Sequence, residues 1–286
     1  MKTVGIVSTG AMGSAVASSL SRSGARVVAT FAGRSDRTAR LAERAEVELV
    51  SDLAAVVARS DCVLSVVPPE AASEVASAIR TAVLAEKVRP LVVDLNAVAP
   101  ATAQQLHDTI RDAGCGFVDG SISGPPPWHE NTTRIYLSGE RARDVATLPF
   151  AGVERIVVGD RIGAASAVKM STASVYKGTT AVLAQTLRAA AANGVLEHVL
   201  ADLRTGSPEL VENAGRRLAM AAAKSGRYVG EMREIAVTQA GVGLTPALFE
   251  GMAEVYSSLA ATDAAERAPE EIPGETSLAD VLDAMR

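Results

Sequence analysis

The 286-residue chain is poor in the residues that cross-link small folds or bind metals. It contains two cysteines and three histidines. Two cysteines cannot build a disulfide framework, and Cys62 and Cys115 lie in apolar surroundings that predict buried thiols. The histidines are scattered, so no metal-ligand spacing occurs and we expect no bound metal.

Aromatic residues, excess positive charge and long apolar runs are also scarce. Aromatic residues make up 3% of the chain. The net charge is −5, and this acidic balance argues against nucleic-acid binding. No apolar run reaches the ~18 residues that a membrane span needs. The opening "MKTVGIV" enters a strand without the apolar segment of a signal peptide. We therefore expect a cytoplasmic protein that binds neither nucleic acid nor a membrane.

Short β-branched runs alternate with helical segments over the first part of the chain. The expected strands are "TVGIVS", "ARVVATF", "CVLSVV", "PLVVDL" and "GFVDGSI". Apolar strands alternating with helices predict a parallel sheet covered on both faces, with ligands beyond the carboxyl ends of the strands. The pattern is that of an α/β Rossmann fold, a doubly wound sheet.

The second part of the chain is dominated by helix. "RIYLSG" and "ERIVVG" predict two more strands, and residues 164–192 form one expected helix because they lack proline and are rich in alanine. At 1.5 Å per residue this helix is roughly 43 Å long, enough to join two domains. We expect a nucleotide-binding domain at residues 1–162 and an all-α substrate and dimerisation domain at 163–286.

The stretch "VGIVSTGAMGSAVASSL" predicts a strand, a turn and a helix, the order of a dinucleotide-binding loop. Gly10 and Gly13 occupy the second and third positions of the G-x-G-x-x-G pattern, and Ser8 replaces the first glycine. The second glycine lets the backbone approach a pyrophosphate, and the third lets helix and strand pack closely. We expect Ser8 to make the turn with a negative φ; an ordinary strand-turn-helix is the alternative.

The second expected strand ends in "FAGRSDR". An NAD-binding fold usually places an acidic residue here to hold the ribose 2′-hydroxyl. Gly33, Arg34 and Ser35 instead offer a guanidinium and a hydroxyl, which suit a 2′-phosphate. NADP(H) is therefore the favoured cofactor, with Asp36 as the residue that speaks for NAD.

These motifs, in this order, resemble the β-hydroxyacid dehydrogenase superfamily, which includes 6-phosphogluconate dehydrogenase and the imine reductases. The resemblance runs over nearly the whole chain. "SGPPPW", "SAVKMSTASVYKGTTA" and "GEMREIAVT" are similar to a little-characterised subgroup of it. By this resemblance the cofactor is bound by Ser8, Gly10, Ala11, Met12, Gly13, Gly33, Arg34, Ser35, Val67, Pro68 and Asn96, and the substrate by Ser123 and Gly124.

The resemblance also implies that Lys169 is the catalytic acid or base. The family has asparagine four residues after the lysine, where this chain has Ala173. On a helix Tyr176 and Lys177 share a face with Lys169, which makes Tyr176 a second catalytic candidate. Lys177 either depresses the pKa of Lys169 or holds a substrate carboxylate. The alternative is that these side chains snorkel from a long, mostly buried helix.

Further candidates follow from the loop "GPPPWH" and from the helical part. Trp128 follows three prolines and is expected either to wall a substrate pocket or to lie in an exposed loop or subunit contact. His129 is an alternative proton donor. Arg233 and Glu234 fall where the family has a Lys-Asp pair, and both a site role and an ion pair are open.

The sequence thus predicts an NADP(H)-dependent oxidoreductase acting on a C=O/C–OH or C=N centre of a small metabolite. An imine reductase using Tyr176 and Lys169 and a nucleotide-binding relative without turnover are the alternatives. The resemblance implies a homodimer, with the active site between the two domains. Substrate, reaction direction and stereochemistry are not specified by these motifs.

Overall fold

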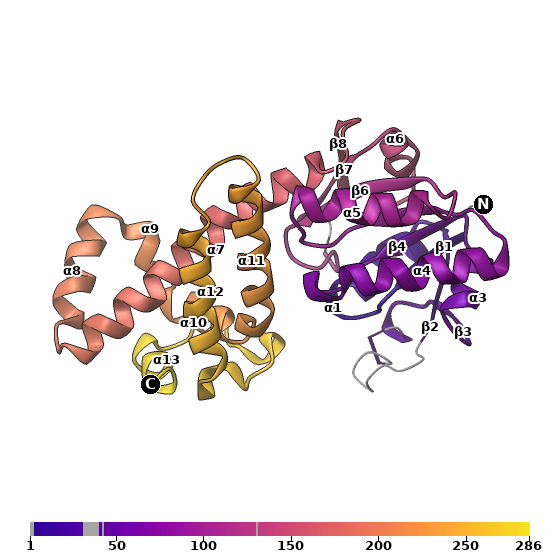
Figure 1. Cartoon of the computed structure of the whole chain (residues 1–286). Helices are drawn as coiled ribbons and strands as arrows, with labels where there is room; N and C mark the ends of the chain where they lie inside the picture. The colour runs from indigo at the N-terminus through magenta and orange to yellow at the C-terminus, as the bar shows by residue number, and fades with distance from the viewer. Residues whose placement is uncertain (1–2, 31–39, 42, 130) are drawn as a thin grey trace. The chain divides into compact units, whose positions relative to one another are not determined.

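The computed structural model describes residues 3–30, 40–41, 43–129 and 131–286. The chain divides into two compact units, residues 1–170 and 171–286. The first unit contains the sheet and the second is helical (Figure 1).

Within the described residues, the first unit is built on an eight-stranded sheet in the order β3-β2-β1-β4-β5-β6-β7-β8. Strands β1 to β6 are parallel, whereas β7 pairs antiparallel with β6 and β8 pairs parallel with β7. The strands are β1 (Thr3–Val7), β2 (Arg26–Thr30), β3 (Glu48–Val50), β4 (Cys62–Ser65), β5 (Leu91–Asp94), β6 (Phe117–Ser123), β7 (Thr133–Ser138) and β8 (Val153–Gly159). The predicted doubly wound α/β fold is confirmed.

Helices cover both faces of this sheet. On one face α1 packs through Val16 and Leu20 against Ile6 of β1, and on the other α4 and α5 pack through Ile79 and Leu106. Because both faces are buried, the strands are continuous apolar runs rather than alternating ones. The helices with described bounds that lie wholly in this unit are α1 (Ala11–Arg22), α3 (Leu53–Ala58), the 3-10 turn η1 (Pro69–Ala71), α4 (Ala72–Glu86), α5 (Pro100–Arg111) and α6 (Ala142–Ala146).

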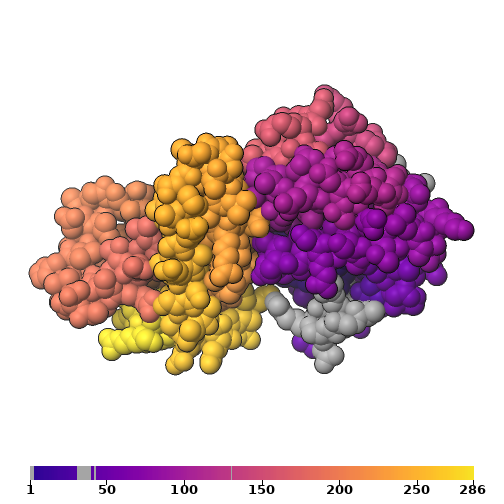
Figure 2. All heavy atoms as spheres, viewed as in Figure 1, coloured from indigo at the N-terminus to yellow at the C-terminus, as the bar shows by residue number. Residues whose placement is uncertain are grey.

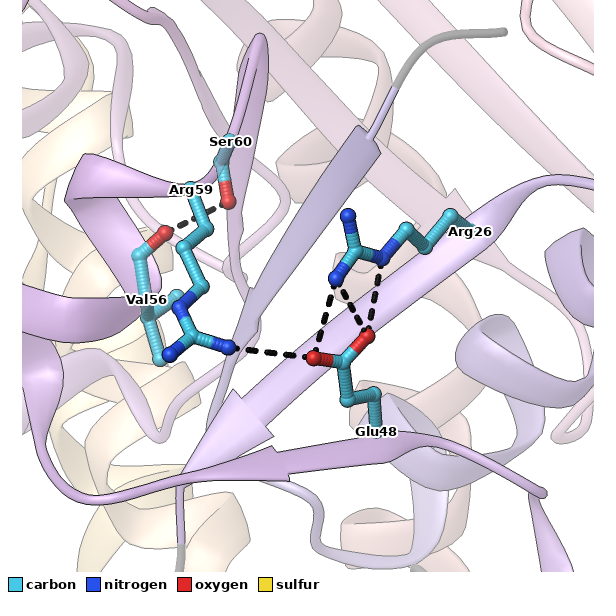
Figure 3. Close-up of polar contacts among 5 residues, drawn as sticks. All are labelled: Arg26, Glu48, Val56, Arg59 and Ser60. Atoms are coloured by element: carbon cyan, nitrogen blue, oxygen red, sulfur yellow. Dashed lines mark hydrogen bonds and ion pairs between the residues drawn. The ribbon is translucent and has the colours of Figure 1, made fainter.

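A small ion-pair network lies beside the edge strand β3 (Figure 3). Glu48 of β3 accepts hydrogen bonds from Arg26 of β2 at 2.8 and 3.0 Å and from Arg59 at 3.1 Å. Nearby, the Ser60 hydroxyl donates to the Val56 carbonyl. Exposed pairs of this kind add little stability. Charge on an edge strand does discourage further strand pairing.

The long helix predicted for residues 164–192 is confirmed as α7 (Ala164–Ala192). Its first residues belong to the sheet-containing unit and the remainder to the helical unit. The other helices are α8 (Leu196–Gly206), α9 (Pro208–Val211), α10 (Ala214–Ala222), α11 (Ser225–Ala240), α12 (Ala247–Ala260) and α13 (Leu278–Ala284), with 3-10 turns η2 (Asp263–Ala265) and η3 (Pro269–Glu271). Helices α11 and α12 lie side by side on the surface of this unit (Figure 2).

Candidate functional site

The strand order reverses between β1 and β4, next to the centre of the sheet. Chain segments leave these two strands toward helices on opposite faces, since α1 and α4 belong to different core clusters. In a doubly wound sheet, this switch point opens the crevice that binds ligands. The loop after β1 and the segment Val66–Pro68 after β4 therefore border the expected cofactor site.

The loop after β1 begins with a strained residue. Ser8 has φ of +77°, so our expectation of a negative φ is wrong. The turn needs the left-handed conformation that a glycine adopts without strain, and an L-residue adopts it at a cost of roughly 1–2 kcal/mol. The chain therefore keeps the turn geometry of a dinucleotide-binding loop although it lacks the first glycine.

Gly13 and Gly10 have different structural roles in this loop. A Cβ on Gly13 would stand 2.0 Å from the Ser8 carbonyl oxygen, so close packing of α1 on the turn requires a glycine there. A Cβ on Gly10 would meet only the Ser8 hydroxyl oxygen, at 3.9 Å. Gly10 thus has open space beside it, as expected of a residue whose backbone a ligand approaches.

The N-terminus of α1 fits an anionic ligand. Gly10 is its N-cap, no side chain caps it, and its first turn has no acidic residue. The amides of Ala11, Met12 and Gly13 have no acceptor within the helix, and the helix dipole favours negative charge there. A pyrophosphate fits this loop in both shape and charge.

Asn96 follows β5, and its hydrogen bonds connect the ends of β4 and β5. Its Oδ1 accepts from the Val67 amide at 2.6 Å, and its Nδ2 donates to Asp94 and to the Ser65 hydroxyl. Asn96 is 2% exposed. Its effect on a cofactor would therefore run mainly through the backbone of Val67 and Pro68, which it holds in place.

Lys169 and Ser123 come together at the end of β6. The Lys169 ammonium donates to the carbonyl of Ile122 at 2.8 Å, one residue before Ser123. Both side chains are half-buried. Gly124, which follows, has φ of +113°, and a Cβ there would lie 2.3 Å from the Thr132 carbonyl oxygen. The amine is thus held beyond the carboxyl ends of the parallel strands, where the loop after β1 also lies.

A buried carboxylate that the sequence reading missed lies in the same strand. Asp119 accepts hydrogen bonds from the Ser138 hydroxyl at 2.8 Å and from the Ser166 hydroxyl at 2.6 Å. It also accepts from the backbone amides of Gly163 and Ser166 at 3.0 and 3.1 Å. Burial raises the pKa of Asp119, and these hydrogen bonds oppose that shift. An acidic residue inside an apolar strand was the available signal.

Several predicted site residues are placed elsewhere or not described. The Trp128 ring stacks with the Arg44 guanidinium at 4.3 Å, and the preceding carbonyl accepts from Arg22, the last residue of α1. His129 is exposed. Gly33, Arg34 and Ser35, on which the NADP(H) prediction rests, lie outside the described residues.

In the helical unit, Lys177 is engaged within the protein. Its ammonium forms an ion pair with Glu231 of α11 and lies 4.3 Å from the centre of the Tyr228 ring. Arg227 also pairs with Glu231, at 3.1 Å. The Tyr256 hydroxyl donates to the Lys177 carbonyl, and burial, together with Tyr228, raises the pKa of Tyr256. This cluster binds α7 to α11 and α12.

The other predicted residues of this unit are more exposed. Tyr176 is 69% exposed. Arg233 is exposed, and Glu234 is half-buried. The ion pair with α7 is therefore made by Glu231, three residues before the position that the sequence singles out. The roles of Tyr176 and Lys177 toward a substrate remain predictions.

The sequence matches the models of two protein families. Residues 3–149, about half of the chain, match the family model described as the NAD binding domain of 6-phosphogluconate dehydrogenase. The chain belongs to this family. Residues 190–259 match a second model, described as a domain of unknown function, DUF1932. The resemblance to the 6-phosphogluconate dehydrogenase-like superfamily is thereby confirmed.

Relatives of this family member include proteins without an assigned reaction. An uncharacterized 28.5 kDa protein in the 7S RNA 5′ region of Methanothermus fervidus is 29% identical over 168 residues, 59% of this chain. The chain spans 63% of the length of that curated relative. A conserved protein of unknown function with structural similarity to 3-hydroxyacid dehydrogenases is 31% identical, covering 90% of this chain and 96% of its own, with a TM-score of 0.66.

The fold extends to more distant relatives. An imine reductase variant from Myxococcus stipitatus, solved in complex with NAD+, is 20% identical and matches all of both chains with a TM-score of 0.58. Family membership identifies residues 3–149 as an NAD-binding domain. In the described part of the chain, no helix has the length and apolarity to cross a membrane. No cluster of potential metal ligands occurs among the same residues.

Proposed function

We propose that the protein is an NADP(H)-dependent oxidoreductase that transfers hydride to or from a C=O/C–OH or C=N centre of a small metabolite, with Lys169 as general acid or base. The observation that carries this proposal is the position of the Lys169 amine. It donates a hydrogen bond to the Ile122 carbonyl beside Ser123, and β6 ends at the same side of the sheet as β1, whose carboxyl end bears the Ser8–Gly13 loop. When bound, the nicotinamide supplies or accepts the hydride.

Residues of the chain itself would bind the cofactor, orient the substrate and transfer the proton. The amides of Ala11, Met12 and Gly13 hold the pyrophosphate, while Asn96 fixes the backbone at Val67. Lys169 moves a proton to or from the heteroatom of the substrate, and Ser123 orients that group by a hydrogen bond. Residues 1–162 would form the nucleotide domain, and 163–286 the substrate and dimerisation domain.

Replacing Lys169 by methionine tests the catalytic role. General acid–base catalysis contributes roughly 10²–10⁴-fold, so kcat should fall by about that factor. The Kd for NADPH should not change, because the phosphates are held at the other loop. The matched control is Lys87→Met, the same change at an exposed lysine of the same unit. Full turnover in Lys169→Met would end the proposal.

The preference for NADP(H) is proposed on the sequence Gly33-Arg34-Ser35. A guanidinium and a hydroxyl favour the 2′-phosphate of NADPH over the bare ribose of NADH. Titration calorimetry with both nucleotides should give tighter binding of NADPH. Arg34→Ala should weaken NADPH binding and leave NADH binding unchanged. Equal affinities in the parent protein would contradict the preference.

An imine reductase is the second candidate, favoured by one observation. Ala173, at the position of the family's asparagine, is buried and offers no side chain to orient a hydroxyl. An iminium substrate needs less hydroxyl orientation, and Tyr176 and Lys169 would then share the proton chemistry. Assays with cyclic imines and with β-keto acids under NADPH separate the two reactions. Turnover of keto acids alone excludes the imine reductase.

A nucleotide-binding relative without turnover is the third candidate. It predicts tight NADPH binding in the parent protein and in Lys169→Met, with no turnover of either substrate class by the parent. A Lys169-dependent rate with any carbonyl or imine excludes it. A cytoplasmic location remains a prediction from the sequence.

A homodimer is proposed from the surface of the helical unit. Val175, Tyr176 and Val182 of α7 and Leu248 of α12 are each more than half exposed. A groove of about 570 Å³ lies between α7 and α12, with Val182, Leu248 and Met252 in its walls. Exposed apolar side chains gathered beside such a groove favour an interaction site. Sedimentation should give twice the chain mass, and Val182→Glu should give the monomer.

A further inference from the structure

The buried carboxylate Asp119 is not used by the proposed chemistry, yet it lies where the first turn of α7 meets the sheet. Asp119 is fully buried, with no exposed surface. Among the residues that the structure describes, no cationic side chain is within ion-pair distance of it. A buried carboxylate held by hydrogen bonds alone is costly, and such groups commonly serve function rather than stability.

Three of the four hydrogen bonds to Asp119 come from the start of α7. The Gly163 amide directly precedes the helix, the Ser166 amide and hydroxyl belong to its first turn, and the fourth donor, the Ser138 hydroxyl, lies on β7. The Ser138 hydroxyl oxygen also accepts from the Ala165 amide at 3.0 Å. Two helix amides that have no intrahelical acceptor, those of Ala165 and Ser166, are thus bound to β7 and β6. A negative charge at this end also suits the helix dipole.

A further bond fixes the helix along the strand. The Ser121 hydroxyl donates to the Ala165 carbonyl at 2.8 Å. Alternate residues of a strand point to the same side, so Asp119 and Ser121 both face α7. Ser166 and Lys169 are three residues apart and share one face of the helix. The contacts at Asp119 therefore set the position from which the Lys169 side chain reaches Ile122.

We propose that Asp119 is a positioning residue that holds the first turn of α7 on β6 and β7, so that the Lys169 amine stays on the Ile122 carbonyl beside Ser123. This inference rests on the proposed function insofar as the amine is the proton donor. The local effect of Asp119 on Lys169 can be measured without any substrate.

The experiment compares four variants. Asp119→Ala removes all four bonds. Asp119→Asn keeps an oxygen for the two amides and the Ser138 hydroxyl, and its NH2 group donates to the Ser166 hydroxyl oxygen. Ser166→Ala removes the 2.6 Å bond alone. The matched control is Ser19→Ala, which removes a buried hydroxyl of the same unit whose hydrogen bond goes to the Ala151 carbonyl and not to α7.

Two readouts are independent of substrate. Hydrogen exchange reports the amides of Ala165 and Ser166, and acylation by acetic anhydride, followed by mass spectrometry, reports the Lys169 amine. In Asp119→Ala we expect exchange at these amides to be at least about tenfold faster, since several charge-assisted bonds are lost. Lys169 should be acylated severalfold faster. Asp119→Asn should behave nearly as the parent, Ser166→Ala should be intermediate, and Ser19→Ala should leave both rates unchanged.

Turnover per bound NADPH, with a cyclic imine or a β-keto acid, is the third readout. A variant that merely unfolds loses NADPH sites but keeps the rate per site, whereas a misplaced amine lowers kcat per site and leaves the KM for NADPH unchanged. If Asp119→Ala does not fold, Ser166→Ala and Asp119→Asn carry the test through exchange and acylation. The proposal is overturned if Asp119→Ala exchanges and is acylated at the rates of the parent protein. If Asp119→Ala does not fold, the same result in Ser166→Ala overturns it. Full turnover in Lys169→Met would instead remove the proposed function, while the two substrate-independent rates still decide the role of Asp119.

Discussion

Two glycines of one loop should respond oppositely to the same substitution. A Cβ on Gly13 would lie 2.0 Å from the Ser8 carbonyl oxygen, so that backbone must move by about 1 Å to reach an allowed contact. Overpacking against rigid neighbours costs up to about 3 kcal/mol. For a protein of about this length, 1 kcal/mol corresponds to about 2–4 °C, so at that upper figure Gly13→Ala should lower the Tm by about 6–12 °C.

Gly10→Ala should leave the fold intact and weaken cofactor binding. Its Cβ would meet only the Ser8 hydroxyl oxygen at 3.9 Å, and the φ of −65° at Gly10 is open to alanine. The Tm without cofactor should therefore stay within about 2 °C of the parent. A methyl group where the pyrophosphate approaches should raise the Kd for NADPH at least about tenfold, which removes about 1.4 kcal/mol of ligand stabilisation.

Differential scanning fluorimetry of both variants, with and without NADPH, provides the measurement. We expect Gly13→Ala to melt early in either condition. Gly10→Ala should melt as the parent does alone and show a smaller shift with NADPH. An unchanged Tm for Gly13→Ala would contradict the packing of Ser8 on α1. An undiminished NADPH shift for Gly10→Ala would mean that this loop does not hold the pyrophosphate.

Substitutions at three further residues test individual contacts by chemical denaturation. Ser8→Gly should stabilise the protein by about 0.5–1 kcal/mol, because relief of the positive φ exceeds the entropy of an added glycine; Ser8→Ala should show no gain. Thr9→Val should stabilise by about 1 kcal/mol, since the Thr9 hydroxyl is buried and has no hydrogen-bond partner among the described residues; a loss would imply a hidden partner. Lys177→Met should destabilise the protein by about 3 kcal/mol, because it leaves the Glu231 carboxylate, whose side chain is 5% exposed, paired with Arg227 alone. A change below about 1 kcal/mol would show that Arg227 suffices to compensate the charge of Glu231.

The fold was predictable where local pattern determines structure. The strands β1, β4 and β5 are buried on both faces, so their sequences are short, continuous apolar runs. The helical segments between them mix apolar with polar residues, and this difference is visible in the sequence. Helix α7 was predictable because 29 residues without proline and with one glycine favour a single helix. The glycine pattern also predicted the strand, turn and helix of the proposed cofactor loop, although it gave the wrong φ at Ser8, since spacing does not report the conformation that a turn imposes.

The missed parts of the site depend on contacts between distant residues. Asp119 meets Ser138 and Ser166 across 19 and 47 positions of the chain, and Lys177 meets Glu231 across 54. No local period links such residues, so the sequence showed only that each is polar. Lys169 was located by family resemblance, and its bond to the Ile122 carbonyl became visible only with β6 and α7 both in place.

The stacking of Trp128 on Arg44 places the chain's single tryptophan in the first unit. Tryptophan emission, excited at wavelengths that tyrosine does not absorb, therefore reports on the sheet-containing half alone, while far-ultraviolet circular dichroism is weighted toward the helices of the other half. A melt recorded with both signals resolves whether the halves unfold together. Reduced nicotinamide absorbs where indole emits, so quenching of Trp128 by added NADPH makes the native chain its own optical sensor of cofactor occupancy.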